Sequence, residues 1–391
     1  MSAAAQVAGD GPAVALLQPH PVDTLELVAA ASPRTYHASM PGYRPTELRS
    51  APAAAARLGA AEVLVKDESA RLGLPSFKVL GASWAVYRAL LHRLGATPEQ
   101  VPTFQALQEA VRPLHPFSLS AATDGNHGRA VAHMAALLGL GADIYVPDNT
   151  VAARIDAIAG EGARVTVVDG GYDDAVRRSA QDASDRCLVI SDTSWEGYEQ
   201  VPGWVIEGYA TVFDEIEEQL ERDGLRRPDV VAVPIGVGAL AAAVVRHFWS
   251  APAPRPRIVG VEPTSAACVL ESVAAGQIVT LTHPQESIMA GLNCATPSLI
   301  AWPLVSRGID MYLAVPDSFV ADATRLLAAD GIVAGECGAA GLAAMTALTD
   351  DPHVGGAREA LGLGEDSRVL LICTEGATDP EAYRRLTADR S

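Results

Sequence analysis

Lysine is rare in this sequence, and the few lysines present are candidates for chemistry that arginine cannot perform. Of the 29 basic residues only Lys66 and Lys78 are lysine, and the others are arginine. A lysine amine can lose its proton and form an imine with a carbonyl carbon, whereas a guanidinium cannot. We take Lys66 as retained by chance and Lys78 as the candidate nucleophile.

Lys78 lies in SFKVLGA, directly before a segment with helical periodicity. At the start of a helix, the positive end of the helix dipole and partial burial would both lower the pKa of the amine. This segment predicts an imine-forming lysine. An ordinary lysine in the first helical turn is an equal alternative.

A polar turn, ATDGNHG at residues 122–128, joins a predicted strand to a predicted helix. The backbone N–H groups from Thr123 to His127 and the helix N-terminus could bind a small carboxylate. Asn126 could donate to a ring oxygen, and Asp124 could move protons. The alternatives are that Asp124 and Asn126 only cap the helix and that His127 is structural.

A glycine-rich segment, PIGVGALA at residues 234–241, lies between a predicted buried strand and a helix. Its glycines would let backbone amides approach a phosphate. The spacing also fits G-x-G-x-x-A, and Glu262 ends the next strand at about the offset of a ribose-binding acid. A nicotinamide-binding loop is therefore a competing interpretation.

Two further strand ends carry polar side chains. Asp192 would lie at the same sheet edge as Asp124, and two acids in one cleft can divide acid and base roles. Taken alone, this segment favours the alternative that Asp192 is a solvated strand-end residue or a helix cap. In CTEGATD, residues 373–379, a hydroxyl or thiol could contact a ring nitrogen, although Cys373 could equally be buried in the core.

Alternating strand-like and helix-like segments connect these motifs. Strands are predicted at 63–65, 117–122, 143–147, 164–170, 188–192, 230–235, 257–263, 312–317 and 368–376, and helices at 82–94, 128–140, 151–160, 207–220, 239–248 and 338–348. This order indicates βαβ units and an α/β fold with two open, twisted, mostly parallel sheets flanked by helices. Residues 1 to about 40 lack periodicity and are expected to form a loosely packed lead-in.

Composition excludes several classes of function. The 391 residues carry a net charge of −18 and no basic run, which disfavours nucleic acid and anionic membranes as partners. The first basic residue is Arg34, and no long apolar span occurs, so we expect a cytoplasmic protein. Five cysteines without C-x-x-C spacing argue against a structural zinc site, and we expect no metal.

Taken in order, the motifs resemble the tryptophan-synthase-like (fold type II) group of pyridoxal-phosphate enzymes, which includes serine and threonine dehydratases. Within that group, KDESARLGLPSFKVLGAS, ATDGNHGRAVA, SDTSWEGYEQVP, IMAGLNCATPS, GECGAAGL and TEGATDP are most similar to the diaminopropionate ammonia-lyases. The similarity runs from about Gly42 to the C-terminus. It implies pyridoxal 5'-phosphate as cofactor.

The resemblance also implies a role for each site residue. Lys78 would form the imine, with Phe77 beside the cofactor and Asn126 on the ring 3-oxygen. The phosphate would lie on the backbone of Gly236, Val237, Gly238 and Ala239, and Thr374 would contact the ring nitrogen. The substrate carboxylate would be bound by Thr123, Asp124, Gly125 and His127.

Two carboxylates distinguish this chain within the group. Dehydratases usually have serine where Asp124 stands, and a carboxylate suits a leaving group that arrives as an ammonium. Asp192 is implied as a second acid or base, so that both D and L substrates could react. The chain departs from the pattern at Cys337, usually serine, at Ala377, usually acidic, and in Pro234-Ile235, which begins the glycine loop.

The expected activity is α,β-elimination of 2,3-diaminopropionate, L and possibly D, to pyruvate and ammonia. The alternatives are a serine/threonine dehydratase, then an NAD-dependent oxidoreductase, then a non-catalytic pyridoxal-phosphate-binding protein. The resemblance implies a large cofactor-binding domain, residues 1–80 and 193–391, and a small domain, residues 81–192. It also implies a homodimer with a small amino-acid substrate.

Overall fold

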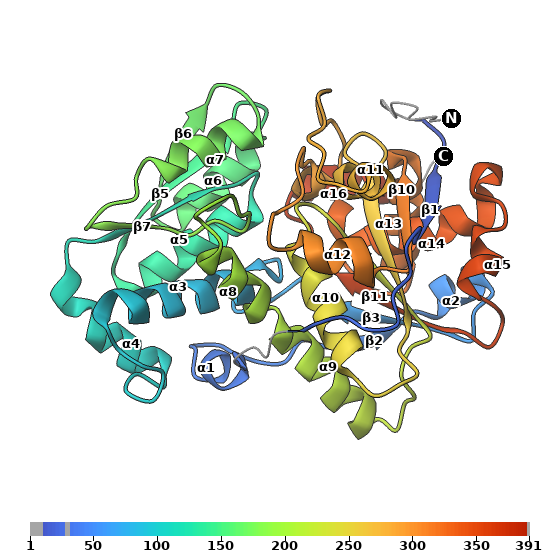
Figure 1. Cartoon of the computed structure of the whole chain (residues 1–391), viewed down its shortest axis with the longest axis horizontal. Coiled ribbons are helices and arrows are strands. Elements are labelled where there is room, and N and C mark those ends of the chain that lie inside the picture. Colours follow the sequence, from blue (N-terminus) through green and yellow to red (C-terminus); the bar gives the residue numbers. More distant parts are fainter. Residues whose placement is uncertain (1–10, 28–31, 389–391) are drawn as a thin grey trace. The chain divides into compact units, whose positions relative to one another are not determined.

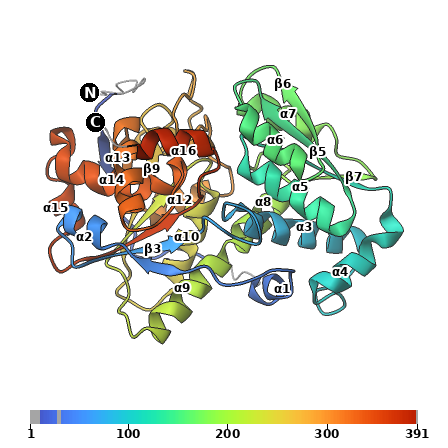
Figure 2. The same ribbon diagram turned by 180° about the vertical axis from the view of Figure 1, so that it is seen from behind.

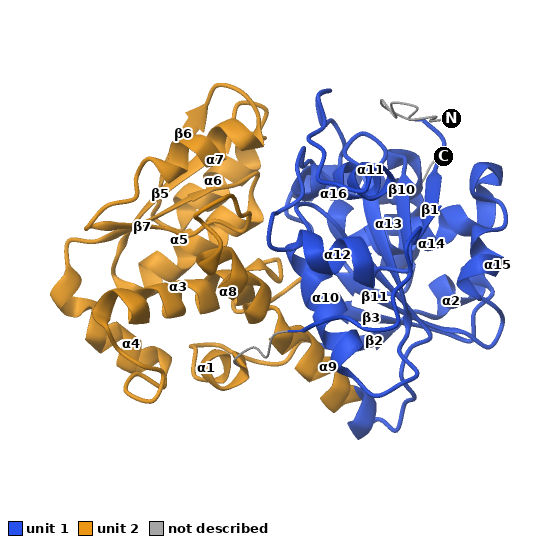
Figure 3. Cartoon of the chain, viewed as in Figure 1, with its two compact units in different colours: residues 1–27, 47–67, 220–391 blue, residues 28–46, 68–219 orange. Residues whose placement is uncertain are grey.

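The computed structural model describes residues 11–27 and 32–388, which fold as two compact units (Figure 3). Unit 1 comprises Met1–Leu27, Glu47–Asp67 and Leu220–Ser391, and unit 2 comprises Val28–Thr46 and Glu68–Gln219. Within the described residues, no helix combines the length and the apolar character needed to cross a membrane.

Unit 1 is built on a seven-stranded sheet with the order β1-β10-β9-β8-β11-β3-β2 (Figure 1). The strands are β1 (Val14–Leu17), β2 (Leu48–Ser50), β3 (Glu62–Asp67), β8 (Val230–Pro234), β9 (Arg257–Pro263), β10 (Met311–Val315) and β11 (Arg368–Cys373). The five central strands are parallel, and the edge strands β1 and β2 pair antiparallel. Continuous apolar runs such as VVAVP in β8 suit strands that are buried on both faces.

Helices cover both faces of this sheet. They are α2 (Pro52–Leu58), α10 (Ala239–Ser250), α11 (Cys268–Ala275), α12 (Trp302–Gly308), α13 (Asp317–Ala329), α14 (Glu336–Asp350), α15 (Ala357–Leu361) and α16 (Pro380–Thr387). Figure 1 shows α10 and α12 in front of the sheet, and Figure 2, from behind, shows α13 and α14. Helix α14 is buried from Glu336 to Leu348, because its alanines and glycines allow close packing on β8 and β11.

Unit 2 contains a four-stranded, fully parallel sheet with the order β6-β5-β4-β7. Its strands are β4 (Ser118–Ala122), β5 (Gly141–Pro147), β6 (Arg164–Val168) and β7 (Cys187–Val189). Its helices are α1 (Arg34–Ala38), α3 (Lys78–Leu94), α4 (Phe104–Val111), α5 (Asn126–Leu138), α6 (Ala152–Gly160), α7 (Tyr172–Ala180) and α8 (Gln200–Gly208). Helix α9 (Ala210–Arg222) carries the chain out of unit 2.

Helix α3 packs closely against α8, and two glycines permit this contact. A Cβ at Gly208 would lie 2.5 Å from the Leu80 carbonyl oxygen, and one at Gly81 would lie 2.6 Å from the Tyr209 ring. Both distances are too short for real atoms, so a larger residue would push the two helices apart. The first turn of α3 is thereby held in a defined position.

The predicted α/β architecture is confirmed, and two details are corrected. Helix α3 begins at Lys78 rather than at Ala82. The segment before residue 40 is loosely packed only in part, since β1 pairs with β10 and α1 buries Tyr36 and His37, whereas residues 18–27 form no helix or strand and are not buried. Such short elements depend on tertiary packing, so their periodicity carries little signal. Residues 1–10 and 28–31 lie outside the described part of the chain.

The predicted domain division, residues 81–192 against 1–80 and 193–391, stays a prediction. Unit 2 contains residues 81–192 and also residues 68–80 and 193–219. The added segments supply the start of α3 and all of α8, which pack on each other within unit 2.

Candidate active site

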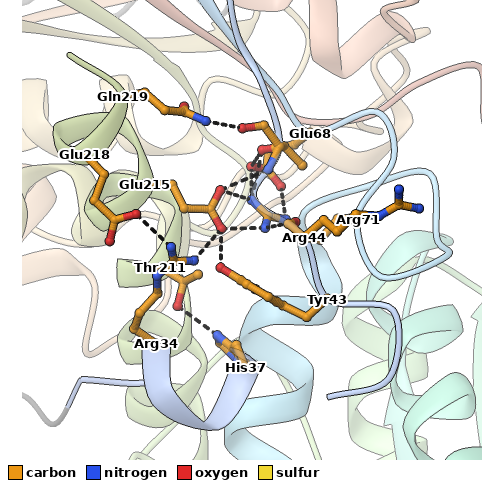
Figure 4. Close-up of polar contacts among 11 residues, drawn as sticks. Arg34, His37, Tyr43, Arg44, Glu68, Arg71, Thr211, Glu215, Glu218 and Gln219 are labelled. Carbon is orange, nitrogen blue, oxygen red and sulfur yellow. Dashed lines mark hydrogen bonds and ion pairs between the residues drawn. The ribbon is translucent and has the colours of Figure 1, made fainter. Parts of the chain in front are cut away.

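The chain segment that leads into Lys78 is held by a buried arginine (Figure 4). Between Arg71 and Leu74 the backbone turns tightly, with hydrogen bonds in both directions of 2.8 and 2.9 Å. The Arg71 guanidinium is fully buried and donates to Glu68 Oε2 at 2.8 Å and to Glu215 Oε1 at 2.7 Å. These bonds fix the path of the segment on the way to α3.

The same arginine belongs to a buried polar cluster of Thr46, Glu68, Arg71, Glu215 and Gln219. Thr46 donates through its backbone N–H to Glu215 at 3.1 Å and through its hydroxyl to Glu68 at 2.7 Å, and Gln219 donates to the Thr46 carbonyl at 2.7 Å. Thr46, Glu68 and Gln219 are also the residues at which the chain enters or leaves unit 2. Because the buried charges are paired and hydrogen-bonded, the cluster avoids the large cost of an unpaired buried ion.

Lys78 is the first residue of α3, and its ammonium group is paired with Asp192. The Nζ–Oδ2 distance is 2.6 Å, and the Tyr172 hydroxyl donates to Oδ1 at 2.9 Å. Burial disfavours the charged amine, but the Asp192 carboxylate outweighs burial and raises the pKa of Lys78. The prediction of a lowered lysine pKa is therefore wrong, because a carboxylate 114 positions away in the sequence dominates over the helix terminus.

Asp124 and Asp192 follow neighbouring parallel strands, β4 and β7, and so lie at the same edge of the unit 2 sheet. Burial raises the pKa of Asp124 to about 6, against the opposing charges of Arg154 and Lys78. Burial also opposes ionisation of Asp192, but the interaction with His127, the Lys78 ammonium and the hydrogen bonds from Lys78 and Tyr172 hold its pKa well below the usual range. Two carboxyl groups with widely separated pKa values can divide acid and base roles.

The turn between β4 and α5 is compact. Strand β4 ends at Ala122 and α5 begins at Asn126, and the Thr123 hydroxyl oxygen accepts from the Gly125 N–H at 2.9 Å. A Cβ at Gly128 would lie 2.3 Å from Thr123 Cγ2, so the helix can approach the turn only with glycine there. The turn thus lies directly at the N-terminus of α5, where an anion is favoured.

His127 and Phe77 are buried beside these groups. His127 Nε2 lies 2.8 Å from the Ile190 carbonyl oxygen, and His127 Nδ1 lies 3.9 Å from Asp192 Oδ2. The Phe77 ring packs on the Tyr209 ring with centroids 4.7 Å apart. Unit 2 therefore brings together the predicted residues Lys78, Asp124, Asn126, His127 and Asp192.

The remaining predicted residues lie in unit 1, at the carboxyl ends of the adjacent strands β8 and β11. Gly238 has φ 101° and precedes α10, and a Cβ at Gly236 would lie only 3.0 Å from the Gly291 carbonyl oxygen. Thr374 follows β11, and its buried hydroxyl has no hydrogen-bond partner among the described residues. A glycine loop at a helix N-terminus and an unpaired buried hydroxyl fit the phosphate and the ring nitrogen of pyridoxal phosphate.

Glu262 does not act as the nicotinamide interpretation requires. Its carboxylate is buried and accepts from the backbone N–H groups of Val269 and Leu270, both at 2.8 Å. These bonds satisfy the first turn of α11, so Glu262 is used as a helix-capping acid. Glu262 therefore no longer supports the interpretation of the glycine-rich segment as a nicotinamide-binding loop.

The sequence analysis missed Tyr172 and Tyr209. Tyr172 begins α7 directly after a strand and a Gly-Gly pair, so its place at a strand end was the available signal. Tyr209 lies between α8 and α9 and carries no such signal; only packing places its ring on Phe77.

Comparisons with known proteins agree with this geometry. The family model for pyridoxal-phosphate dependent enzymes matches residues 40–375. Diaminopropionate ammonia-lyase from Escherichia coli K12 is 37% identical over 360 residues, which cover 90% of this chain and 89% of that protein. The Salmonella typhimurium enzyme of the same name is 35% identical, with 89% of each chain covered.

Solved structures give the same result. The crystal structure of the Escherichia coli diaminopropionate ammonia-lyase with D-serine superposes with a TM-score of 0.88 and 34% identity, covering 96% of this chain and 97% of that one. The same enzyme with an aminoacrylate-PLP azomethine intermediate superposes with a TM-score of 0.86. The resemblance predicted from the sequence, and its cofactor, are confirmed. The chain belongs to the family of pyridoxal-phosphate-dependent enzymes.

Proposed function

We propose that this chain is a pyridoxal-phosphate-dependent ammonia-lyase that converts 2,3-diaminopropionate to pyruvate and ammonia. The family match and the two diaminopropionate ammonia-lyases described above support the reaction. The observation that carries the proposal is the carboxylate pair around Lys78, in which Asp124 has a pKa of about 6 and Asp192 stays ionised. A dehydratase has no evident need for an acid at the position of Asp124.

We assign each part of the cofactor to particular groups. Lys78 would form the covalent bond, with Phe77 beside it, and Asn126 would contact the 3-oxygen. The backbone of residues 236–239 would hold the phosphate, and the Thr374 hydroxyl would donate to the unprotonated ring nitrogen. When bound, the cofactor supplies an electron sink for negative charge at the substrate α-carbon.

The turn that carries Asp124 would bind the substrate. Thr123, Gly125 and His127 would hold the substrate carboxylate at the start of α5. The N–H groups of Thr123 and Gly125 would first have to release the Tyr145 carbonyl and the Thr123 hydroxyl, to which each donates at 2.9 Å. The Asp124 carboxylate holds the β-ammonium group and moves protons to and from it. Asp124, or Lys78 once released, removes the α-proton of one enantiomer, and Asp192 Oδ2 removes it from the other, so that D and L substrates both react.

An absorption spectrum followed by substrate addition in the same cuvette tests the function. We expect a lysine–cofactor band in the purified protein and rapid pyruvate formation from L- and from D-2,3-diaminopropionate. Faster release of 2-oxo acid from serine or threonine would instead indicate a dehydratase. A band without elimination from any amino acid would indicate a non-catalytic binding protein and contradict the proposal.

We also propose that the protein is a cytoplasmic homodimer. The low cysteine content and the acidic composition support the compartment, and the family resemblance supports the dimer. Light scattering during size-exclusion chromatography should give twice the 40.7 kDa mass of one chain. A mass of 40.7 kDa at working concentrations would contradict the dimer.

A further inference from the structure

The protonation state of the His127 ring follows from one hydrogen bond. Nε2 lies 2.8 Å from the Ile190 carbonyl oxygen, which can only accept, so Nε2 carries the hydrogen. In a neutral ring Nδ1 is then a bare acceptor. Nδ1 is buried and has no hydrogen-bond partner in the part of the chain that the structure describes. An unused buried acceptor costs stability, which indicates a use for it.

This acceptor faces the ion pair of the proposed cofactor lysine. His127 Nδ1 lies 3.9 Å from Asp192 Oδ2, and the same oxygen accepts from Lys78 Nζ at 2.6 Å. Oδ2 therefore lies between an ammonium donor and an imidazole acceptor. A shortening of about 1 Å brings Nδ1 and Oδ2 to hydrogen-bond distance, and a proton between them is then shared.

Lys78 has to lose a proton before it can attack a carbonyl carbon, because only the neutral amine is nucleophilic. In the ion pair with Asp192 the charged form is favoured. We propose that His127 Nδ1, acting through Asp192, accepts this proton while Lys78 bonds to the cofactor and returns it afterwards. This inference rests on the proposed function, in which Lys78 is the lysine that binds pyridoxal phosphate.

The step conserves charge within the buried group. Lys78 gives one proton to Asp192 Oδ2, and Asp192 passes a proton to His127 Nδ1, so the pair of ammonium and carboxylate becomes a pair of imidazolium and carboxylate. The neutral amine then forms the carbon–nitrogen bond. The carbonyl oxygen would leave as water with one proton returned from His127 and a second taken from the attacking amine, so that the imine nitrogen keeps one hydrogen and the positive charge. No net charge is created in a buried site, where it would be costly.

The surrounding charges favour this transfer once Lys78 is neutral. Burial lowers the pKa of His127, Asp192 raises it, and the Lys78 charge lowers it further. When Lys78 becomes neutral, it no longer lowers the pKa of His127, and the raising effect of Asp192 remains. Tyr172 donates to the other Asp192 oxygen, and Asp124 and Tyr209 also interact with Lys78 and Asp192. His127 is thus a positioning residue that acts through Asp192.

Two substitutions separate proton transfer from structure. In His127→Gln the side-chain amide can still donate to the Ile190 carbonyl, but the titratable nitrogen is lost. In His127→Asn an amide group remains near the position of Nδ1, and the bond to Ile190 is lost. The measurement is the rate at which apoenzyme gains the lysine–cofactor band after mixing with pyridoxal phosphate, over roughly pH 6 to 9. Melting temperatures of both variants report on folding.

We expect His127→Gln to melt like the wild type but to load at least about tenfold more slowly at neutral pH. Its rate should rise roughly tenfold per pH unit, because the lysine proton must then leave to hydroxide, whereas the wild-type rate should depend only weakly on pH. A purely structural role would instead leave His127→Gln normal and impair His127→Asn. Equal rates and equal pH profiles for His127→Gln and the wild type would overturn the proposal.

A measurement on the wild-type apoenzyme covers the case in which the variants do not fold. Nitrogen-15 chemical shifts of the histidines should show His127 as the neutral ring with hydrogen on Nε2 at neutral pH. An imidazolium, or hydrogen on Nδ1, would overturn the proposal. Failure of the wild type to form any band would contradict the proposed function instead, so the two failures are distinguishable.

Discussion

Lys78→Ala is expected to lose the lysine–cofactor absorption band and to lower the rate of elimination by about 10³-fold or more. The amine of Lys78 is the proposed covalent attachment point, and the variant has no other group at the start of α3 that could replace it. The measurement combines the absorption spectrum with pyruvate formation from 2,3-diaminopropionate. The melting temperature of the apoprotein should fall, because removal of the ammonium leaves the buried Asp192 carboxylate without its charged partner.

The second lysine provides the matched comparison. Because the chain contains only Lys66 and Lys78, borohydride reduction followed by peptide mapping has two possible sites of attachment. We expect the reduced cofactor on the peptide that contains Lys78. A band that persists in Lys78→Ala, with the cofactor found on Lys66, would transfer the covalent role to Lys66.

Asp124→Asn is expected to lower kcat by about 10²- to 10⁴-fold while the cofactor band remains. The amide can neither hold the β-ammonium by charge nor take up a proton. In the wild type the rate should fall as the pH falls through about 6, where Asp124 gains its proton. This limb of the pH profile should be absent from the variant.

The melting temperature of Asp124→Asn shows whether a lower rate comes from lost catalysis or from a disturbed fold. Burial raises the pKa of Asp124 in the folded state, so folding favours the protonated form. The free energy of unfolding therefore falls as the pH rises from the pKa of Asp124 in the unfolded chain through about 6, its pKa in the folded chain. Above that pH the loss of stability stays constant. Asp124→Asn should accordingly melt at the same or a higher temperature than the wild type at pH 8.

The control for Asp124→Asn is Asp156→Asn, the same chemical change at an exposed position in α6. It should leave kcat, the pH profile and the melting temperature unchanged. If Asp124→Asn turns over at the wild-type rate, Asp124 has no part in the reaction. A normal band with unchanged turnover would leave Asp192 and Lys78 as the groups that move protons.

Local patterns in the sequence predicted the strands β3 to β11 and the helices that separate several of them, but not β1, β2 or helices such as α13. Buried parallel strands are short apolar runs, whereas the helices between them repeat their apolar residues every three to four positions. This difference distinguishes β8 from α10 in the sequence. Because ligands bind at the carboxyl ends of parallel strands, the polar residues after those runs were chosen as candidate site residues. Asp124 and Asp192 were selected in this way, whereas Lys78 was selected because lysine is rare in the sequence.

The tertiary structure decided what those residues can do. The pairing of β4 with β7 places Asp192 beside Lys78, and this contact reverses the predicted shift of the lysine pKa. The capping role of Glu262 and the tautomer of His127 likewise depend on partners that no local pattern specifies. Periodicity is a property of neighbouring residues, whereas charge state depends on burial and on groups far apart in the chain. The sequence alone therefore indicated most of the strands and the first candidate residues, and only the folded chain determined the short N-terminal elements, the contacts of Tyr172 and Tyr209, and the protonation of the site.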